Sequence, residues 1–600
     1  MHRVNESHRA VLRWLMSHAR ASAVRALRIS GLLLGVVITC DHAVALGAGT
    51  PGACAFNARV VTHHQGGSVV DAAGAGWTSC AYPTGYPTSE TNIGITPKGT
   101  ILFSPALTEN SMARSTDGGA SWSLTYPANE QYTALWNTTD PVLAVDRQTG
   151  RVFWAHATGA TRTLPVLVAQ SPLPDFVPTV FAAAYGFQVY SSADEGRTFT
   201  TADYQGAPVG DWEKLMVGPP RSDAPAAERP TGYPNVVYLC GNSPFEVTGP
   251  GRLCYRSLDG GLTFAEAGFV TPSQNMPPDS CPPLAANTGA VASDGTVYQP
   301  VSCNGASYVA NSEDEGASYS FRQVPGAPPS NGLSGSLQIV IDRSDALYAE
   351  WVVGDKLFYA VSRDRARTWS KPIMISAPGV HVITRPAPAA GARGQFGVAY
   401  YGSTDAKATK LTLYITQTAN ALVSDPLLRS GALNDPKHPI FTDAGVSSHS
   451  PRADYIGAAF DNAGTLWAGG VRQLADPDPN GRQATTGYVG RLLGPTPGSI
   501  AARLPAHRPC LGRRALTIRL NDPLGPEHLV SARVYVNGKR LAVRRGRRLM
   551  APIALRGLPR GAIKVVVIAR TSLNRRLVST RAYRPCTTPT PARSSRHAAP

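Results

Sequence analysis

The octapeptide STDGGASW at residues 115–122 decides the fold, because close copies of it recur along the chain. Four copies follow: SADEGRTF (192–199), SLDGGLTF (257–264), SEDEGASY (312–319) and SRDRARTW (362–369). They share the pattern S-x-D-x-G-x-[ST]-aromatic, with Ala366 in the glycine position of the last copy. Aspartate accepts hydrogen bonds from nearby backbone N–H groups, glycine reaches positive φ at little cost, and a buried aromatic ring anchors a turn. The octamer is therefore predicted to be a tight turn between strands and not a catalytic site.

A second repeat precedes or alternates with the octamers. It reads as apolar strand, Gly/Asp turn and apolar strand, in GITPKGTILF (94–103), AVDRQTGRVFW (144–154), AVASDGTVY (290–298), VIDRSDALY (340–348) and AAFDNAGTLW (458–467). This is the pattern of a β-hairpin. Hairpin and octamer together make a four-stranded unit, and such units in series are typical of an all-β propeller.

Seven units are favoured and six remain open. The sixth and seventh units lack the octamer, and the seventh is one strand short. We expect residues 53–64 (ACAFNARVVTHH) to supply that strand and close the ring.

The domain boundaries follow from composition. Residues 1–48 are predicted to be a signal peptide, because the short apolar run ISGLLLGVVIT (29–39) follows several arginines and precedes Ala43-Val44-Ala45. The run is too short for a membrane span. The propeller is expected over 49–493, a linker over 494–509, an Ig-like basic β-sandwich over 510–587 and a disordered tail over 588–600. The protein is expected to be secreted, either extracellular or attached to the cell envelope.

Charge is unevenly distributed along the chain. Residues 501–600 hold 22 Lys and Arg against two acidic residues, Asp522 and Glu527, while the whole chain has a net charge of +17. Such asymmetry predicts an anionic partner for the tail, for example a cell-wall glycopolymer, lipid headgroups or nucleic acid. Solvated charge without a partner is the alternative. No base-reading motif is present, so sequence-specific nucleic-acid binding is not expected. The protein is expected to be a monomer.

The cysteines indicate disulfides in an exported protein. Apart from Cys40, eight cysteines fall into close pairs: Cys54/Cys80, Cys240/Cys254, Cys281/Cys303 and Cys510/Cys586. There is no CxxC or HExxH motif. DPDPNG (476–481) resembles the start of a calcium loop, but Gly487 stands where that loop needs a bidentate glutamate. No metal or cofactor is predicted.

The octamers resemble the Asp boxes, or BNR repeats, of the sialidase (neuraminidase) superfamily. The resemblance covers roughly residues 85–490. It implies that the octamers lie at the rim and that the site lies on the opposite face, over the central channel. In sialidases three arginines clamp the substrate carboxylate, a tyrosine with a partner glutamate is the nucleophile, and an aspartate is the acid/base.

This chain departs from the sialidase pattern. The family's Arg-Ile-Pro motif is missing, because YPTGYPTSETNIG (82–94) contains no arginine. Seven units also differ from the six of sialidases. Asp boxes occur in other propellers as well, such as sortilin-type receptors and cellulases acting on xyloglucan.

Candidate residues therefore come from position alone. If each octamer joins strands three and four, the beginnings of the first strands lie on the other face, where loops displayed by a rigid scaffold usually carry function. Arg385, Arg452 and Arg472 are the candidates for an anion clamp. Tyr455, or Tyr400 or Tyr401, is the candidate nucleophile. Asp140 or Glu213 would transfer the proton, and Asp454 and Glu350 belong to the same face.

The leading hypothesis is a secreted, sialidase-like protein that acts on a glycan or glycoconjugate, with exo-α-sialidase-type hydrolysis as its activity. The alternative is a non-catalytic propeller that binds glycans or proteins at the cell envelope. The sequence leaves open which of the two applies. The alternative for any single polar residue of this face is that it only forms hydrogen bonds with backbone groups at the end of a sheet.

Overall fold

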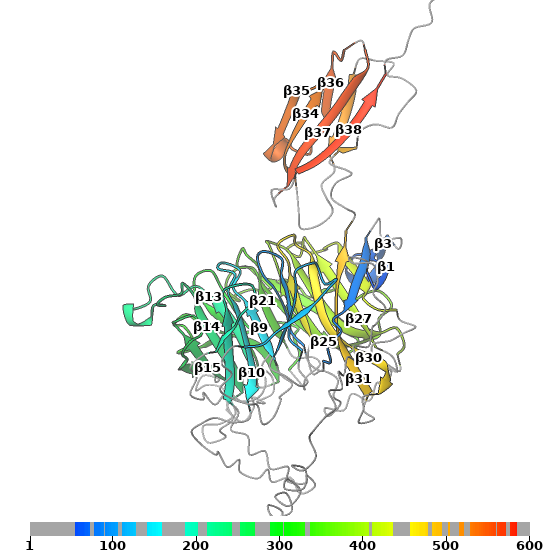
Figure 1. Ribbon diagram of the computed structural model, residues 1–600. Helices are drawn as coiled ribbons and strands as arrows, with labels where there is room; N and C mark the ends of the chain where they lie inside the picture. Colours follow the sequence, from blue (N-terminus) through cyan, green and yellow to red (C-terminus); the bar gives the residue numbers. More distant parts are fainter. Residues whose placement is uncertain are drawn as a thin grey trace, which may run out of the picture. The chain divides into compact units, whose positions relative to one another are not determined.

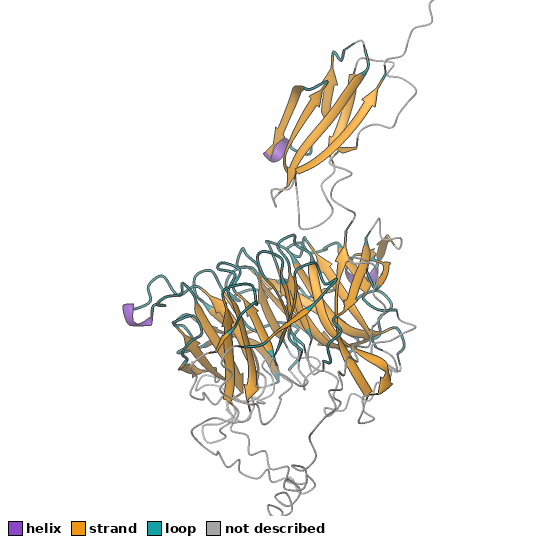
Figure 2. Ribbon diagram, in the orientation of Figure 1, coloured by secondary structure: helices purple, strands orange, loops and turns teal. Residues whose placement is uncertain are grey.

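The computed structural model describes residues 54–71, 77–88, 91–105, 111–127, 141–158, 186–201, 213–242, 252–270, 288–303, 305–329, 337–406, 411–435, 456–477, 483–494, 502–503, 515–520, 529–559, 561–571 and 576–584. These residues form antiparallel strands (Figures 1 and 2). The helical turns among them are short 3-10 turns, namely η1 (Gln65–Gly67), η3 (Ala226–Glu228) and η6 (Gly546–Arg548). None of the described helical segments is long and apolar enough to cross a membrane. The prediction of an all-β chain is confirmed.

The described residues between Phe56 and Leu493 form seven sheets. The first three are β5 (Ile93–Ile95), β6 (Ile101–Phe103), β7 (Met112–Ser115) and β8 (Ser123–Thr125); β9 (Val142–Val145), β10 (Val152–Thr158), β11 (Gly186–Ser192) and β12 (Thr200–Thr201); and β13 (Lys214–Gly218), β14 (Val236–Asn242), β15 (Arg252–Ser257) and β16 (Ala265–Phe269).

The fourth and fifth sheets are β17 (Ala290–Val291), β18 (Val297–Cys303), β19 (Ala306–Ser312) and β20 (Ser320–Gln323); and β21 (Gln338–Ile341), β22 (Leu347–Val353), β23 (Lys356–Ser362) and β24 (Ile373–Met374). The sixth holds β25 (Val382–Ala390), β26 (Phe396–Ser403), β27 (Thr412–Thr418) and β28 (Leu428–Ala432), extended by β2 (Val61–His63) and β3 (Val69–Asp71). The seventh holds β29 (Gly457–Phe460), β30 (Leu466–Pro477), β31 (Gln483–Leu493), β4 (Thr78–Pro83) and β1 (Phe56–Arg59).

The first strands of these sheets close a ring. Each of β5, β9, β13, β17, β21, β25 and β29 contacts the next, and β29 returns to β5. Residues of all seven strands line one central space of about 270 Å³. Most of its lining side chains are aliphatic, such as Ile95, Val217 and Ile341. Radial four-stranded sheets around a central channel define a β-propeller, so the predicted architecture is confirmed at that level.

The ring is closed by N-terminal strands. β4 pairs with β31 in the seventh sheet, and β1 pairs with β4 at its edge. The expectation for residues 53–64 is thus only partly correct, because β1 joins the sheet but β4 makes the closing contact. β4 lies between two strands and is buried on both faces, so its sequence TSCAYP lacks the alternation that marks a half-buried strand.

The octamers have the predicted turn geometry. Each connects the third and fourth strands of its sheet, as 115–122 does between β7 and β8. The Ser115 hydroxyl donates to Asp117 (2.9 Å) and accepts from the Gly119 N–H (2.9 Å), while Asp117 also accepts from the backbone and hydroxyl of Ser121. Burial alone would raise the pKa of Asp117, but these hydrogen bonds outweigh it and lower the pKa. Trp122 packs against the core of the first sheet.

The sixth sheet contains a turn that the sequence pattern missed. Between β27 and β28, the Thr418 hydroxyl donates to the Asn420 side chain (2.8 Å) and accepts from the Asn420 N–H (3.2 Å). The second to fifth octamers make the same two bonds, for example Ser257 with Asp259. The sixth unit therefore lacks the octamer sequence, as expected, but its turn makes these two hydrogen bonds. The seventh sheet has no such turn because its fourth strand, β4, comes from the other end of the chain.

Two of the four predicted disulfides are confirmed. Cys54 is bonded to Cys80, and Cys240 to Cys254. Cys281, Cys510 and Cys586 lie outside the described residues.

The tail forms two further antiparallel sheets. One holds β32 (Ala502–Arg503), β33 (Ala515–Leu520) and β36 (Ile553–Arg556); the other holds β35 (Lys539–Arg545), β34 (Leu529–Val536), β37 (Ile563–Thr571) and β38 (Arg576–Tyr583). Side chains from both sheets share one core that includes Ile518, Val534, Ile553 and Val567. The two sheets therefore pack against each other across this core.

Candidate functional site

The octamers define one face of the propeller, and the candidate site lies on the other. Turns between first and second strands share the face of the octamers, because the strands of each sheet are antiparallel. The first strands begin on the opposite face. Residues 159–185 and 436–455 lie outside the described residues. Asp140, Arg452, Asp454 and Tyr455 also lie outside them.

Glu213 immediately precedes β13 at the mouth of the channel and is fully buried. The neighbouring Lys214 ammonium donates to the backbone carbonyl of Glu213 (2.8 Å). Arg252 is also buried, and burial lowers its pKa to about 10 while the charges of Tyr319 and Glu213 oppose that shift. The guanidinium donates to the Cys240 carbonyl (3.3 Å). Glu213 thus lies in a buried cluster of charged side chains, where it has no surface that a substrate could contact.

Arg385 has the most unusual backbone at the mouth. It lies in β25 with φ of +51°, at a register shift between Thr384 and Ala387. A left-handed residue other than glycine costs on the order of 1–3 kcal/mol, and bulges of this kind re-aim side chains near functional sites. The carbonyl of the next residue, Pro386, accepts a hydrogen bond from Gln338 Nε2. This bond ties the bulge to the fifth sheet.

Glu350 is a buried acid beside that bulge. Gln338 and Glu350 face each other across β21 and β22, and Gln338 Nε2 donates to Glu350 Oε2 (3.3 Å). Glu350 is fully buried, and burial raises its pKa well above the usual value. Its Oε1 has no hydrogen-bond partner among the described residues. Burial of this kind favours the protonated form of the carboxyl.

Tyr400 and Tyr401 do not fit the role of nucleophile. Both are fully buried, their hydroxyls accept hydrogen bonds from the N–H groups of Ala377 (2.9 Å) and Val471 (2.8 Å), and burial raises both pKa values. A substrate cannot reach a side chain with no exposed surface, so this expectation is wrong. The sequence suggested it because two adjacent tyrosines end a strand, but β26 is buried on both faces.

Tyr401 instead lies between Arg385 and Arg472, the two candidates for the anion clamp that the structure describes. The positive charge of Arg385 acts on Tyr401, and the Tyr401 hydroxyl binds the residue before Arg472. Arg472 is partly exposed, and its guanidinium lies 5.9 Å from the centre of the Tyr488 ring. The structure therefore brings Arg385 and Arg472 to the same part of the ring, whereas Glu213 lies in the third sheet.

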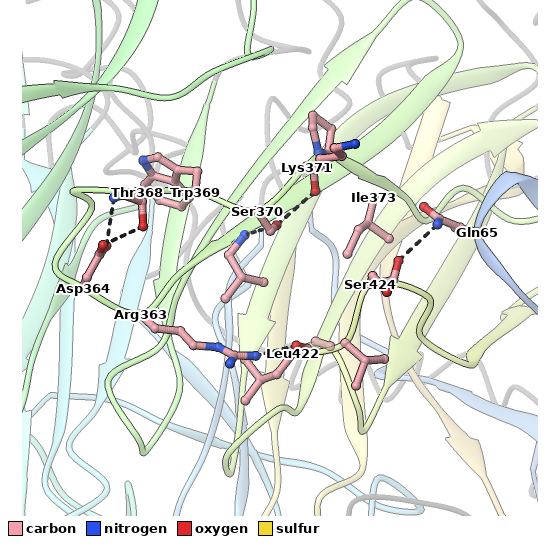
Figure 3. A pocket seen from close by; sticks show the side chains of 14 residues that line it. Gln65, Arg363, Asp364, Thr368, Trp369, Ser370, Lys371, Ile373, Leu422 and Ser424 are labelled. Atoms are coloured by element: carbon pink, nitrogen blue, oxygen red, sulfur yellow. Dashed lines mark hydrogen bonds between the residues drawn. The ribbon is translucent and has the colours of Figure 1, made fainter.

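A second cavity lies at the rim, on the octamer face. It has a volume of about 590 Å³ and is bounded by the octamer 362–369, the following segment to Ile373, the turn 421–424 and Gln65. Its floor is aliphatic, and Arg363, Lys371, Ser370 and Trp369 supply its polar and aromatic groups (Figure 3). Arg363 donates to the Leu422 carbonyl across the gap. Sequence reasoning missed this cavity because two units and an N-terminal turn build it together.

No metal centre is visible in the part of the chain that the structure describes. Those residues contain no group of three or more His, Cys, Asp or Glu side chains that could hold an ion.

Comparison with known proteins gives only distant structural likenesses. No protein-family model and no curated protein matches the chain. Among solved structures, it is similar to a protein of unknown function from Dyadobacter fermentans (13% identity, TM-score 0.35, 69% of this chain and 99% of that one). It is also similar to the fucose-recognising six-bladed lectin of Aleuria aurantia (10%, 0.36, 60% and 98%) and to the NanB sialidase of Streptococcus pneumoniae (12%, 0.34, 68% and 70%).

Proposed function

We propose that the protein is an exported, seven-bladed Asp-box propeller that acts on glycans at the mouth of its central channel, opposite the octamers. The observation that carries the proposal is the buried acid Glu350 beside the left-handed Arg385. Removal of residues 1–48, a linker over 494–509, an Ig-like tail domain and a monomeric state belong to the same proposal. The two disulfides support export.

The chemistry proposed for this mouth is exo-acting glycoside hydrolysis of the exo-α-sialidase type. Arginine forks bind carboxylates in a bidentate manner, so Arg385 and Arg472, with Arg452, would orient an acidic sugar. Glu350 has no exposed surface, so its proposed role is to hold Gln338 and the Arg385 bulge in place and not to touch the substrate. Asp140, Asp454 and Tyr455 remain the candidates for proton transfer and for the nucleophile.

Hydrolysis of a fluorogenic sialoside tests the enzymatic form. We expect turnover by the wild type, and a fall in kcat/KM of about 10- to 100-fold in Glu350→Gln, because the change disturbs Gln338 and with it the Arg385 bulge. Arg385→Asn removes the cation while tolerating a positive φ, and should mainly raise KM. Glu266→Gln, an exposed change on β16, is the matched control. Absence of turnover by the wild type on sialosides and other aryl glycosides would refute the enzymatic form.

A non-catalytic glycan-binding propeller is the second candidate. The observation that favours it is the complete burial of Tyr400 and Tyr401, which leaves no accessible described tyrosine next to Arg385. Under this alternative, immobilised acidic glycans retain the wild type but remain intact, and Arg385→Asn abolishes retention. Release of free sugar during the same assay would exclude it.

A further inference from the structure

The tail sheet β35-β34-β37-β38 has one face in the core and one face outward. Side chains alternate along each strand, and Val534, Val565 and Val567 point into the shared core. Their neighbours point the other way. The register places Arg533 opposite Val543 on one side and Ile568 on the other, and Ile568 opposite Val578. These four residues therefore form one row across the outward face, which we call the tail face. Figure 1 shows the four strands β35, β34, β37 and β38 that carry it.

The middle of the tail face is apolar and exposed. Val543, Val578 and Leu541 are 41%, 37% and 45% exposed, and Ile568 and Val566 are partly exposed. Half-exposed aliphatic side chains gathered on one sheet face are not needed to fold the domain, because the core lies on the other side. A clustered apolar surface rimmed by polar groups marks an interaction site.

Cations surround this apolar centre. Arg545, Lys564 and Arg570 lie at the outer positions of the strands, and Arg533 lies inside the face; all are exposed. Across the described parts of the tail, residues 515–520, 529–559, 561–571 and 576–584, every charged side chain is basic. Two copies of such a face would repel each other, which excludes a second copy of this chain as its occupant.

We propose that the tail face docks on an anionic lipid surface. Aliphatic side chains at the centre would enter the headgroup boundary while the long arginine and lysine side chains reach phosphate groups around them. A soluble polyanion would use the arginines but would leave the exposed valines and leucine without a role. Each cation near an anionic membrane strengthens binding about fivefold, so charge and apolar contact would both contribute to binding by the tail face.

Sedimentation of the full-length protein with vesicles tests this inference. The vesicles are phosphatidylcholine alone, or phosphatidylcholine with about one quarter phosphatidylglycerol. We expect binding to the second kind only. Arg533→Ser/Arg545→Ser should weaken it about 25-fold. Arg519→Ser/Arg556→Ser is the matched control, since it removes the same charge from exposed positions of β33 and β36 and should change binding by less than about threefold.

A third variant separates lipid from soluble polymer. Val543→Ser/Val578→Ser keeps every charge, and we expect it to weaken vesicle binding several-fold. Thermal unfolding verifies that each variant folds. Absence of binding to the anionic vesicles overturns the proposal. Equal weakening by the two arginine pairs also overturns it, because that would indicate an unspecific effect of charge. The proposal fails as well if the valine variant binds vesicles as tightly as the wild type and the protein also binds free heparin, because that would indicate a site for a soluble polymer.

Discussion

At the scale of single residues, the glycines of the turns differ in the space that their neighbours leave for a larger residue. Gly196 has φ of +73°, and an added Cβ would lie 2.6 Å from Leu102 Cδ2 in the neighbouring first sheet. Gly99 has φ of +93° but nothing within 4 Å. The two positions separate the cost of a left-handed backbone from the cost of a collision between sheets.

Gly196→Ala should therefore destabilise the propeller more than Gly99→Ala. We expect about 1–2 kcal/mol for Gly99→Ala from its backbone alone, and a further 1–3 kcal/mol for Gly196→Ala from overpacking against Leu102. Denaturant unfolding followed by tryptophan fluorescence measures both. Equal losses in the two variants would show that the octamer does not press on the neighbouring sheet.

Glu350 makes stability depend on pH in a defined direction. Its folded pKa is raised, so the unfolded chain releases the proton first, above about pH 4.5, and stability falls as pH rises toward the folded pKa. The loss is up to about 1.4 kcal/mol per pH unit in that window. Glu350→Gln should remove this slope and be more stable than the wild type at pH 7. The idea fails if the slopes of the two proteins are the same, or if Glu266→Gln has the same effect.

At the scale of elements, the octamers also join neighbouring sheets. The Glu195 carboxylate in the second octamer accepts hydrogen bonds from Thr96 (3.0 Å) and Thr100 (2.7 Å) of the first sheet. Glu315 in the fourth octamer accepts from the Arg221 N–H (3.1 Å) and from Arg256 (3.3 Å) of the third. The fourth residue of an octamer thus contacts the preceding sheet, and the repeat fixes the ring as well as the turn.

Asp259→Asn tests the turn of the third sheet. Asp259 accepts from the N–H groups of Leu262 (3.0 Å) and Thr263 (2.9 Å) and from the Ser257 hydroxyl (2.7 Å). These bonds outweigh burial and lower its pKa, so its stabilisation is present above the unfolded pKa and is lost as pH falls through the folded pKa. We expect Asp259→Asn to lose about 1 kcal/mol at pH 7, with the difference shrinking as pH falls below about 4. A difference that persists or grows in acid would contradict this explanation.

The elements were predictable where one short segment determines them. The five octamers and the hairpins before them carry their hydrogen-bonding groups within eight to ten residues, so pattern alone places them. The turn at Thr418 and Asn420 keeps those groups without the glycine and the aromatic residue, and pattern matching overlooks it. The same limit applies to the site: Glu350 and Arg385 could be placed on the right face, but the bulge at Arg385 and the burial of Tyr401 arise from contacts between sheets.

At the scale of the whole molecule, the chain closes its ring with strands from its beginning. β4 completes the seventh sheet, and the Cys54–Cys80 disulfide joins the segment before β1 to β4. The second disulfide, Cys240–Cys254, links β14 to β15 within one sheet. Of these two disulfides, only Cys54–Cys80 holds a strand that closes the ring.

Replacing the two cysteines of each bond by alanine should distinguish their roles. Loss of a disulfide costs about 2–4 kcal/mol in either case. Only Cys54→Ala/Cys80→Ala is expected to expose the N-terminal strands, so that limited proteolysis removes them before any other part of the propeller is cut. Early cleavage of those strands in Cys240→Ala/Cys254→Ala as well would show that closure does not depend on the first bond.

Glycan binding by three proteins measured side by side tests the central claim, a glycan site at the channel mouth, most directly. The three are the wild type, Arg385→Asn at the mouth and Arg363→Asn at the rim cavity, applied to one array of acidic and neutral glycans. We predict that the wild type and Arg363→Asn retain the same acidic glycans. Arg385→Asn should retain none, although its melting temperature equals that of the wild type. A wild type that binds no glycan, or loss of binding in Arg363→Asn with retention in Arg385→Asn, would contradict it.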